Sequence, residues 1–136
     1  MPAKWLLKSD PDCYSFADLS RDKQTVWDGV SNNLALKNLR AARRGDLALI
    51  YHTGDEKCLV GLAEIMSEPY PDPKQKDPKL AVVDLEAREA LPRRITLDEV
   101  KKQSALGGFA LVRLPRLSIM PVTEEQWKIL MKLAGA

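Results

Sequence analysis

The sequence predicts an α+β protein in which a small β-barrel of about five to six strands is surrounded by short helices. Apolar runs of strand length recur along the chain and are separated by glycine and proline turns. Short helical patterns, each with its own N-cap residue, interrupt these runs. The order of the elements contains no repeated strand–helix–strand unit, so a parallel α/β sheet is not expected.

The composition is that of an ordinary globular domain. A chain of 136 residues is long enough for one domain with a substantial core, and we expect residues 1–136 to form it. Since 45% of the residues are hydrophobic and 29% are charged, extensive disorder is not expected. The net charge of +2 is too small to indicate a nucleic-acid partner by itself. Two local clusters could lie on a solvated surface or face phosphate: Arg40, Arg43 and Arg44, and Arg113 and Arg116.

Residue usage argues against a metal centre, a cofactor and a membrane. Cys13 and Cys58 are isolated, and with the single His52 they match no usual zinc pattern, so we expect two free thiols in a reducing compartment. The N-terminus has no signal pattern, and no apolar stretch approaches membrane length. We therefore expect a cytoplasmic protein, or a nuclear one in a eukaryote, and nothing demands more than a monomer.

The first thirty residues predict a strand, a helix and a turn. Lys4–Ser9 has the pattern of an opening strand that Pro11 ends. Ser15 followed by Asp18 forms an acidic variant of the capping box, which indicates a short helix. Asp28-Gly29 is a turn because glycine tolerates the positive φ that such corners need.

The next segment combines a helix with a buried strand. Asn32 is placed as the N-cap of a short helix with Leu36 and Leu39 on its apolar face. Residues 46–66 are predicted to form a β-hairpin, with His52 at the end of its first strand. Polar groups at a strand end are suitably placed to form the rim of a ligand site.

Within the hairpin and after it, the sequence indicates a bulge, a loop and a third long strand. Gly61 predicts a bulge or the close approach of another group, and hence a curved sheet. Residues 70–78, rich in proline, predict a stiff surface loop with Lys74, Gln75 and Lys76 at its tip. Residues 80–91 are assigned to a strand, with a helix as the alternative for residues 84–91.

The C-terminal third predicts two helices and two short strands. Capping boxes at Thr96 and Thr123 indicate the starts of the helices. The strands are expected at Phe109–Val112 and Leu117–Met120. Trp127 recurs at helical spacing with later apolar residues, so we expect it in the core.

Several motifs, in order along nearly the whole chain, resemble the EVE domain family. They are Trp5-Leu6-Leu7-Lys8-Ser9-Asp10-Pro11, Tyr14-Ser15, Trp27-Asp28-Gly29-Val30-Ser31-Asn32, Gly45-Asp46, Tyr51-His52-Thr53, Gly61, Tyr70-Pro71-Asp72-Pro73 and Arg116-Leu117-Ser118-Ile119-Met120-Pro121-Val122. This resemblance implies a PUA-like β-barrel with a pocket beside it. It also implies a non-enzymatic module that reads a modified base in DNA or RNA.

The resemblance also implies which residues form the site. The implied ligand-binding positions are Lys8, Ser9, Trp27, Asn32, His52, Thr53, Arg116 and Ser118. Arg40, Arg43 and Arg113 are the candidates for contact with the nucleic-acid backbone. The residue types fit independently, because a flipped base needs an aromatic face for stacking and polar groups for its edge.

The chain departs from the family pattern at three positions, and two other functions stay open. Ser31 stands where the family usually has Arg, Asn33 where it has Tyr, and Asp10 where it commonly has Glu. The first two departures remove a possible phosphate contact and a possible stacking surface. One alternative function is a pocket for a free nucleoside or another small planar ligand. The other is a hydrolase of modified nucleotides with His52 as general base.

Overall fold

The computed structural model describes residues 2–75, 77 and 79–136. Lys76 and Pro78 of the predicted proline-rich loop therefore lie outside the described residues. The strands are β1 (Lys4–Ser9), β2 (Gln24–Trp27), β3 (Leu47–His52), β4 (Cys58–Ile65), β5 (Tyr70–Pro71), β6 (Ala81–Thr96) and β7 (Ile119–Pro121). The helices are α1 (Phe16–Asp22), α2 (Asn33–Ala41), α3 (Leu97–Lys101), α4 (Ala110–Arg113) and α5 (Glu124–Ala134), with a 3₁₀ turn at Ser104–Leu106.

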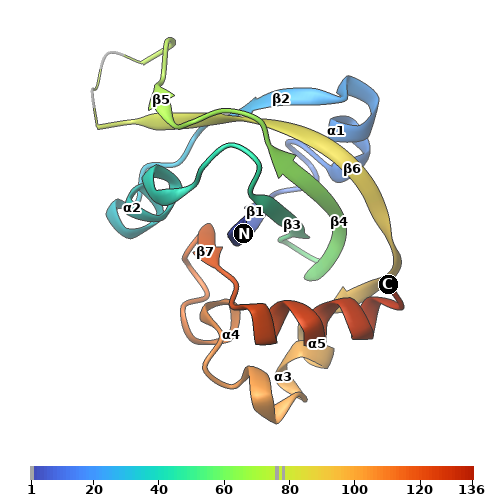
Figure 1. Ribbon diagram of the computed structural model, residues 1–136. Coiled ribbons are helices and arrows are strands. Elements are labelled where there is room, and N and C mark those ends of the chain that lie inside the picture. The colour runs from blue at the N-terminus through green and yellow to red at the C-terminus, as the bar shows by residue number, and fades with distance from the viewer. Residues whose placement is uncertain (1, 76, 78) are drawn as a thin grey trace.

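The strands form one curled sheet in the order β2-β6-β4-β3-β1-β7, and the short β5 pairs with β6. Figure 1 shows the long, bent β6 along the outside of the curl and α5 across its lower end. Helix α2 packs against both β7 and β6, so it fills the opening between the two ends of the sheet. The predicted α+β barrel with helices around it is confirmed.

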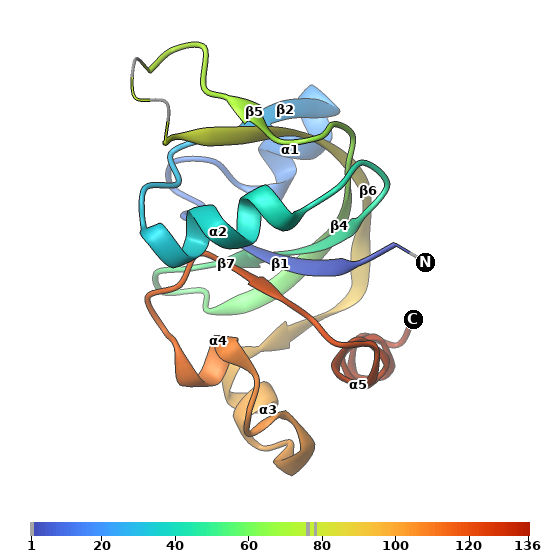
Figure 2. The same ribbon diagram turned by 60° about the vertical axis from the view of Figure 1, so that its left-hand side comes forward.

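Neighbouring strands bring the two ends of the chain together. β1 lies parallel to β3, with Ser9 opposite His52, and antiparallel to β7 on its other side. The Lys8 amide extends this pairing by donating to the Ser118 carbonyl over 2.9 Å. In Figure 2, β7 runs beside β1; the chain reaches it from α4 and continues down to α5. The end of β1 and the segment before β7 therefore meet in one place.

Local capping predictions are confirmed. The side chains of Ser15, Asn32, Thr96 and Thr123 each accept a backbone N–H of the helix that follows, and the capping boxes at Ser15, Thr96 and Thr123 are complete. Gly29 has the positive φ, 77°, that its turn requires. These features depend only on neighbouring residues, which is why the sequence alone indicates them.

The predicted hairpin and its bulge are also confirmed. β3 and β4 pair antiparallel, and the pairing of β4 with β6 shifts register between Leu59 and Gly61. A Cβ added at Gly61 would overlap the ring of Phe16, which packs against the strand at this point. The glycine therefore allows α1 to approach the sheet closely.

The third long strand extends further than expected. Residues 84–91 are strand, as assigned, but β6 continues through Pro92 to Thr96. Between the Gly61–Ala90 and Leu59–Ile95 pairs, residues 91–94 of β6 have no partner in β4. Pro92 lies in this irregular stretch, where its missing N–H removes no hydrogen bond from the ladder.

One predicted strand is wrong. Residues 110–113 form α4, and Phe109 is its N-cap. The Leu114 amide donates to the Ala110 carbonyl over 2.7 Å, and Arg113 donates to Phe109 over 3.1 Å. A run of only four apolar residues does not distinguish a strand from a buried helical turn by periodicity. Here a single turn buries Phe109 and Leu111, so tertiary packing decided the conformation.

Trp127, which was expected in the core, is instead half-buried on α5. Its ring packs against the core, and the Lys4 Nζ lies 5.5 Å from the ring centroid. Within the residues that the structure describes, no helix is long and apolar enough to cross a membrane.

Candidate nucleic-acid interface

A pocket of about 740 Å³ lies where the two ends of the curled sheet face each other. We call it the base pocket, because four of the residues that line it are among those predicted to contact a base. One wall comes from the end of β1 at Lys8–Asp10 and from Ser118, which the β1–β7 pairing holds beside it. The opposite wall is residues 25–30, which include the end of β2 and the Gly29 turn. The volume falls within the range typical of small-ligand sites.

Trp27 supplies the aromatic surface of the base pocket. It is the last residue of β2, pairs with Val83 of β6, and is only 9% exposed. The ring is therefore held by the core while still lining the pocket. An aromatic side chain held in this way is a suitable platform for stacking of a planar ligand.

Lys8 brings positive charge to the pocket wall. Its Nζ donates to the Pro115 carbonyl over 2.7 Å and lies 5.7 Å from the centroid of the Tyr51 ring. Burial lowers the pKa of this ammonium group from its ordinary value. Lys8 therefore connects the wall of the base pocket, through this hydrogen bond, to the loop that contains Pro115.

Hydrogen-bond donors and acceptors, including charged groups of both signs, line the pocket. The Ser9 hydroxyl donates to the Tyr14 carbonyl, which leaves its oxygen as an acceptor. Asp10 and Asp28 add carboxylates, and Lys74 adds a second ammonium group. A wall that mixes donors and acceptors suits the edge of a base better than it suits phosphate alone.

Sequence reasoning missed several polar and aromatic residues of the lining. Asp10, Tyr14, Asp28 and Lys74 all line the base pocket. The Tyr14 hydroxyl donates to Asp22 over 2.9 Å, and burial is the largest cause of the raised pKa of this phenol. Asp10 and Asp28 border turns beside predicted site residues, and that position was the available signal.

Two predicted site residues lie in a separate depression. Asn32 and Arg116, with Arg113, line a groove of about 330 Å³ between the start of α2 and the segment after α4. We call it the α4 groove. The Asn32 Oδ1 accepts the Ala35 amide over 3.1 Å, so its carbonyl oxygen caps α2.

His52 and Thr53 have internal partners. His52 is 3% exposed, its Nε2 accepts the Phe16 amide over 3.0 Å, and its Nδ1 lies 2.9 Å from Glu56 Oε1. The Thr53 amide donates to the Ser9 carbonyl over 2.9 Å. Neither residue is among those that line the base pocket. The structure thus brings Lys8, Ser9, Trp27 and Ser118 together and leaves these two behind the wall.

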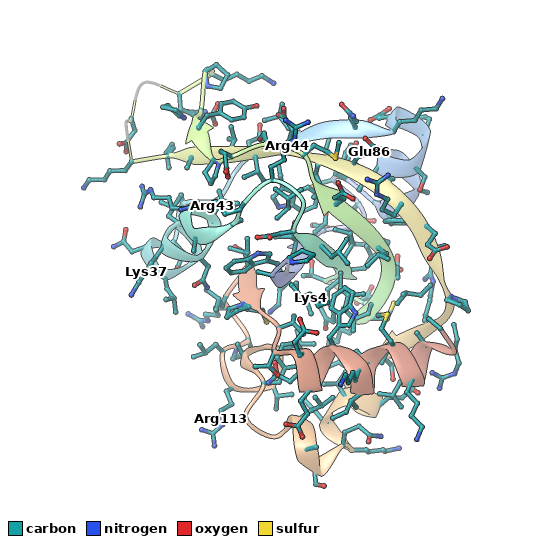
Figure 3. All side chains as sticks on the ribbon, in the orientation of Figure 1. Lys4, Lys37, Arg43, Arg44, Glu86 and Arg113 are labelled. Carbon is teal, nitrogen blue, oxygen red and sulfur yellow. The ribbon has the colours of Figure 1, made fainter. Side chains whose placement is uncertain are left out.

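The three candidate backbone arginines do not form one cluster. Arg40 donates to the Lys79 carbonyl, and Arg43 donates to the carbonyls of Arg40 and Ala42 over 2.7 and 2.8 Å. Figure 3 shows Arg113 well away from Arg43, at the lower end of the molecule. Arg113 therefore belongs with the α4 groove, and the other two lie at the C-terminal end of α2.

The curled sheet, the helices around it and the pocket beside the first strand define a PUA-like α+β module. The sequence profile of the EVE domain matches residues 3–133, so the chain belongs to the EVE domain family. Rat thymocyte nuclear protein 1 is 33% identical to it, over 97% of this chain and 74% of the rat protein.

Solved structures show the same relationship. A protein from Rhodopseudomonas palustris, whose structure was determined by NMR, is 40% identical with a TM-score of 0.93, over 98% of this chain and 93% of that one. Human THYN1 protein, crystallised in complex with DNA that contains 5-methylcytosine, is 30% identical with a TM-score of 0.91. That alignment covers 98% of both chains.

Proposed function

We propose that this protein is a non-enzymatic module that binds DNA carrying a modified base and holds that base, turned out of the stack, in the base pocket. The observation that carries the proposal is the location of Trp27 opposite Lys8, Ser9 and Ser118 around a cavity of about 740 Å³. The complex of the human relative with DNA containing 5-methylcytosine supports DNA as the polymer.

The pocket chemistry supports a pyrimidine with an exocyclic amino group. Trp27 would stack on the base, as aromatic side chains do with extruded bases. Carboxylates accept hydrogen bonds from the amino group of cytosine, and Asp10 and Asp28 supply two candidates. Lys8, Ser9 and Ser118 offer partners for the ring nitrogen and carbonyl acceptors of the same base.

The arrangement of His52 favours binding over hydrolysis. A general base must reach the proton that it abstracts, directly or through one water molecule. His52 is buried, and both ring nitrogens have protein partners within 3.0 Å. A hydrolase that used this imidazole would first have to break those two contacts.

A binding titration tests the proposal. Matched DNA and RNA oligonucleotides, plain or with one 5-methylcytosine, 5-hydroxymethylcytosine or N6-methyladenine, are titrated into the protein and into Trp27→Ala. We expect one modified DNA to bind more tightly than plain DNA, and we expect the variant to lose that preference. Loss of one stacked base costs about 1–3 kcal/mol.

A further variant and a free nucleoside separate the possible explanations of the titration. Trp27→Phe keeps an aromatic ring and should retain part of the preference, which separates stacking from general damage to the core. Equal affinity for the modified nucleoside and the oligonucleotide would instead favour the free-nucleoside alternative. Binding of every oligonucleotide equally, or of none at low salt, would contradict the proposed function.

A further inference from the structure

The exposed large apolar side chains of this protein line two adjacent depressions. In the part of the chain that the structure describes, the exposed large hydrophobic residues are Val26, Leu34 and Leu114, which are 42%, 45% and 45% exposed. Val26 lines the base pocket, whereas Leu34 and Leu114 line the α4 groove. Neighbouring exposed apolar groups of this kind mark a surface that contacts a partner.

The α4 groove also carries positive charge. Arg113 and Arg116 are both exposed and line it. Its lining, as far as the structure describes the chain, contains no acidic side chain. The salt bridges of the described residues include neither arginine, although Arg113 Nε donates to the Gly107 carbonyl over 3.3 Å. Their charge therefore remains available to an anionic partner.

The groove lies next to the base pocket. Pro115 lines the groove, and its carbonyl accepts the Nζ of Lys8, which lines the pocket. Leu117 of the groove directly precedes Ser118 of the pocket along the chain. A polymer with one residue in the pocket would thus pass the groove with a neighbouring residue.

We propose that the α4 groove holds the nucleotides that flank the base in the pocket. Leu34 and Leu114 contact the sugar and base faces of these nucleotides, and Arg113 and Arg116 contact their phosphates. Apolar side chains often insert between neighbouring bases of a nucleic acid, and arginines commonly bind phosphate. The groove combines both chemistries beside the pocket. This inference rests on the proposed function.

The test separates the groove from the pocket by using two probes. The probes are a DNA duplex with one central 5-methylcytosine, and the free nucleoside 5-methyl-2′-deoxycytidine followed by NMR chemical shifts. The groove variants are Arg113→Gln with Arg116→Gln, and Leu34→Ser with Leu114→Ser. All four side chains are exposed, so folding should survive, and circular dichroism checks this. Lys132→Gln, on the far end of α5, is the matched charge control.

We expect each groove double variant to weaken duplex binding by about tenfold. A loss of this size follows when one good hydrogen bond to a charged group, or an equivalent contact, is removed. The arginine pair should also lower the slope of log affinity against log salt by roughly 1 for each phosphate that the variant no longer binds. Chemical shift changes caused by the nucleoside should be the same in the wild type and in both variants. Lys132→Gln should match the wild type throughout.

Other outcomes overturn one proposal or both. If Trp27→Ala abolishes the preference for the modified duplex while the groove variants bind as tightly as Lys132→Gln, the groove inference is wrong and the proposed function stands. A protein partner would then be the better candidate for the groove. If the wild type binds the nucleoside but no duplex, both proposals fail and the free-nucleoside alternative is favoured. If neither probe binds, both proposals fail.

Discussion

The Nε2 atom of His52 accepts a hydrogen bond from the Phe16 amide over 3.0 Å, which joins the end of β3 to the first turn of α1. Since an amide donates to Nε2, that nitrogen carries no proton and the proton lies on Nδ1, 2.9 Å from Glu56 Oε1. The only histidine of the chain thus links a buried backbone group to a surface carboxylate.

His52→Ala should lower the free energy of unfolding by about 2 kcal/mol, because it leaves the buried Phe16 amide without a partner. Urea denaturation at neutral pH measures the change. The folded variant should bind modified DNA as the wild type does. A variant of unchanged stability that fails to bind would show that the imidazole acts on the ligand.

Asp46 should be among the most sensitive polar residues for stability. It is 4% exposed, and its carboxylate accepts the Ala3 amide, the Trp5 indole and the Arg43 amide over 2.8–3.0 Å. Asp46→Ala removes all three bonds and should cost about 3 kcal/mol. Asp46→Asn retains one acceptor oxygen and should cost less. Thermal unfolding measures the stability of both variants, with the exposed change Asp12→Ala as control. An Asp46→Asn protein less stable than Asp46→Ala would contradict this account.

Gly61→Ala should destabilise the protein by about 2 kcal/mol, since the new Cβ overlaps the buried Phe16 ring. Phe16→Leu in the same chain shortens the side chain that obstructs the Cβ. The two changes together should therefore cost less than the sum of the single changes, and a double-mutant cycle measures this coupling. Additive costs would mean that the strain arises elsewhere.

Glu56 should make stability depend on pH on the acidic side. Hydrogen bonding to His52 is the largest cause that lowers the pKa of this carboxyl in the folded state, and the neighbouring Arg94 guanidinium lowers it further. The stabilisation is therefore complete above the ordinary glutamate pKa of about 4.3 and is lost as the pH falls through the lower folded-state pKa. Glu56→Gln should remove stability at neutral pH and little of it in strong acid.

Urea midpoints of the wild type and Glu56→Gln, measured from neutral to strongly acidic pH, check this expectation. Glu89→Gln, an exposed change on β6, serves as the control. If the difference in urea midpoint between the wild type and Glu56→Gln is the same at every pH, the carboxyl contributes no pH dependence to stability.

Elements governed by neighbouring residues were predictable. The caps at Ser15, Asn32, Thr96 and Thr123 depend on side chains within one helical turn of the groups that they satisfy. The β3–β4 hairpin follows from two apolar runs around a glycine turn. The motifs that resemble the EVE domain family lie in order along the chain, so they identified the family.

Long-range pairing decided the remaining elements. β2 became a strand because Thr25–Trp27 pair with residues 83–85 of β6, and four apolar residues became α4 because a helical turn buried Phe109 and Leu111. Neither outcome follows from local pattern.

The sequence by itself determined the fold class, the family and the residue types suited to a base. Only the tertiary structure decided which of those residues share a pocket. The curl of the sheet brings Trp27 opposite Lys8, Ser9 and Ser118, while the parallel pairing of β1 with β3 places His52 behind the wall. Strand order and register set these positions, and both depend on packing between segments far apart in the chain.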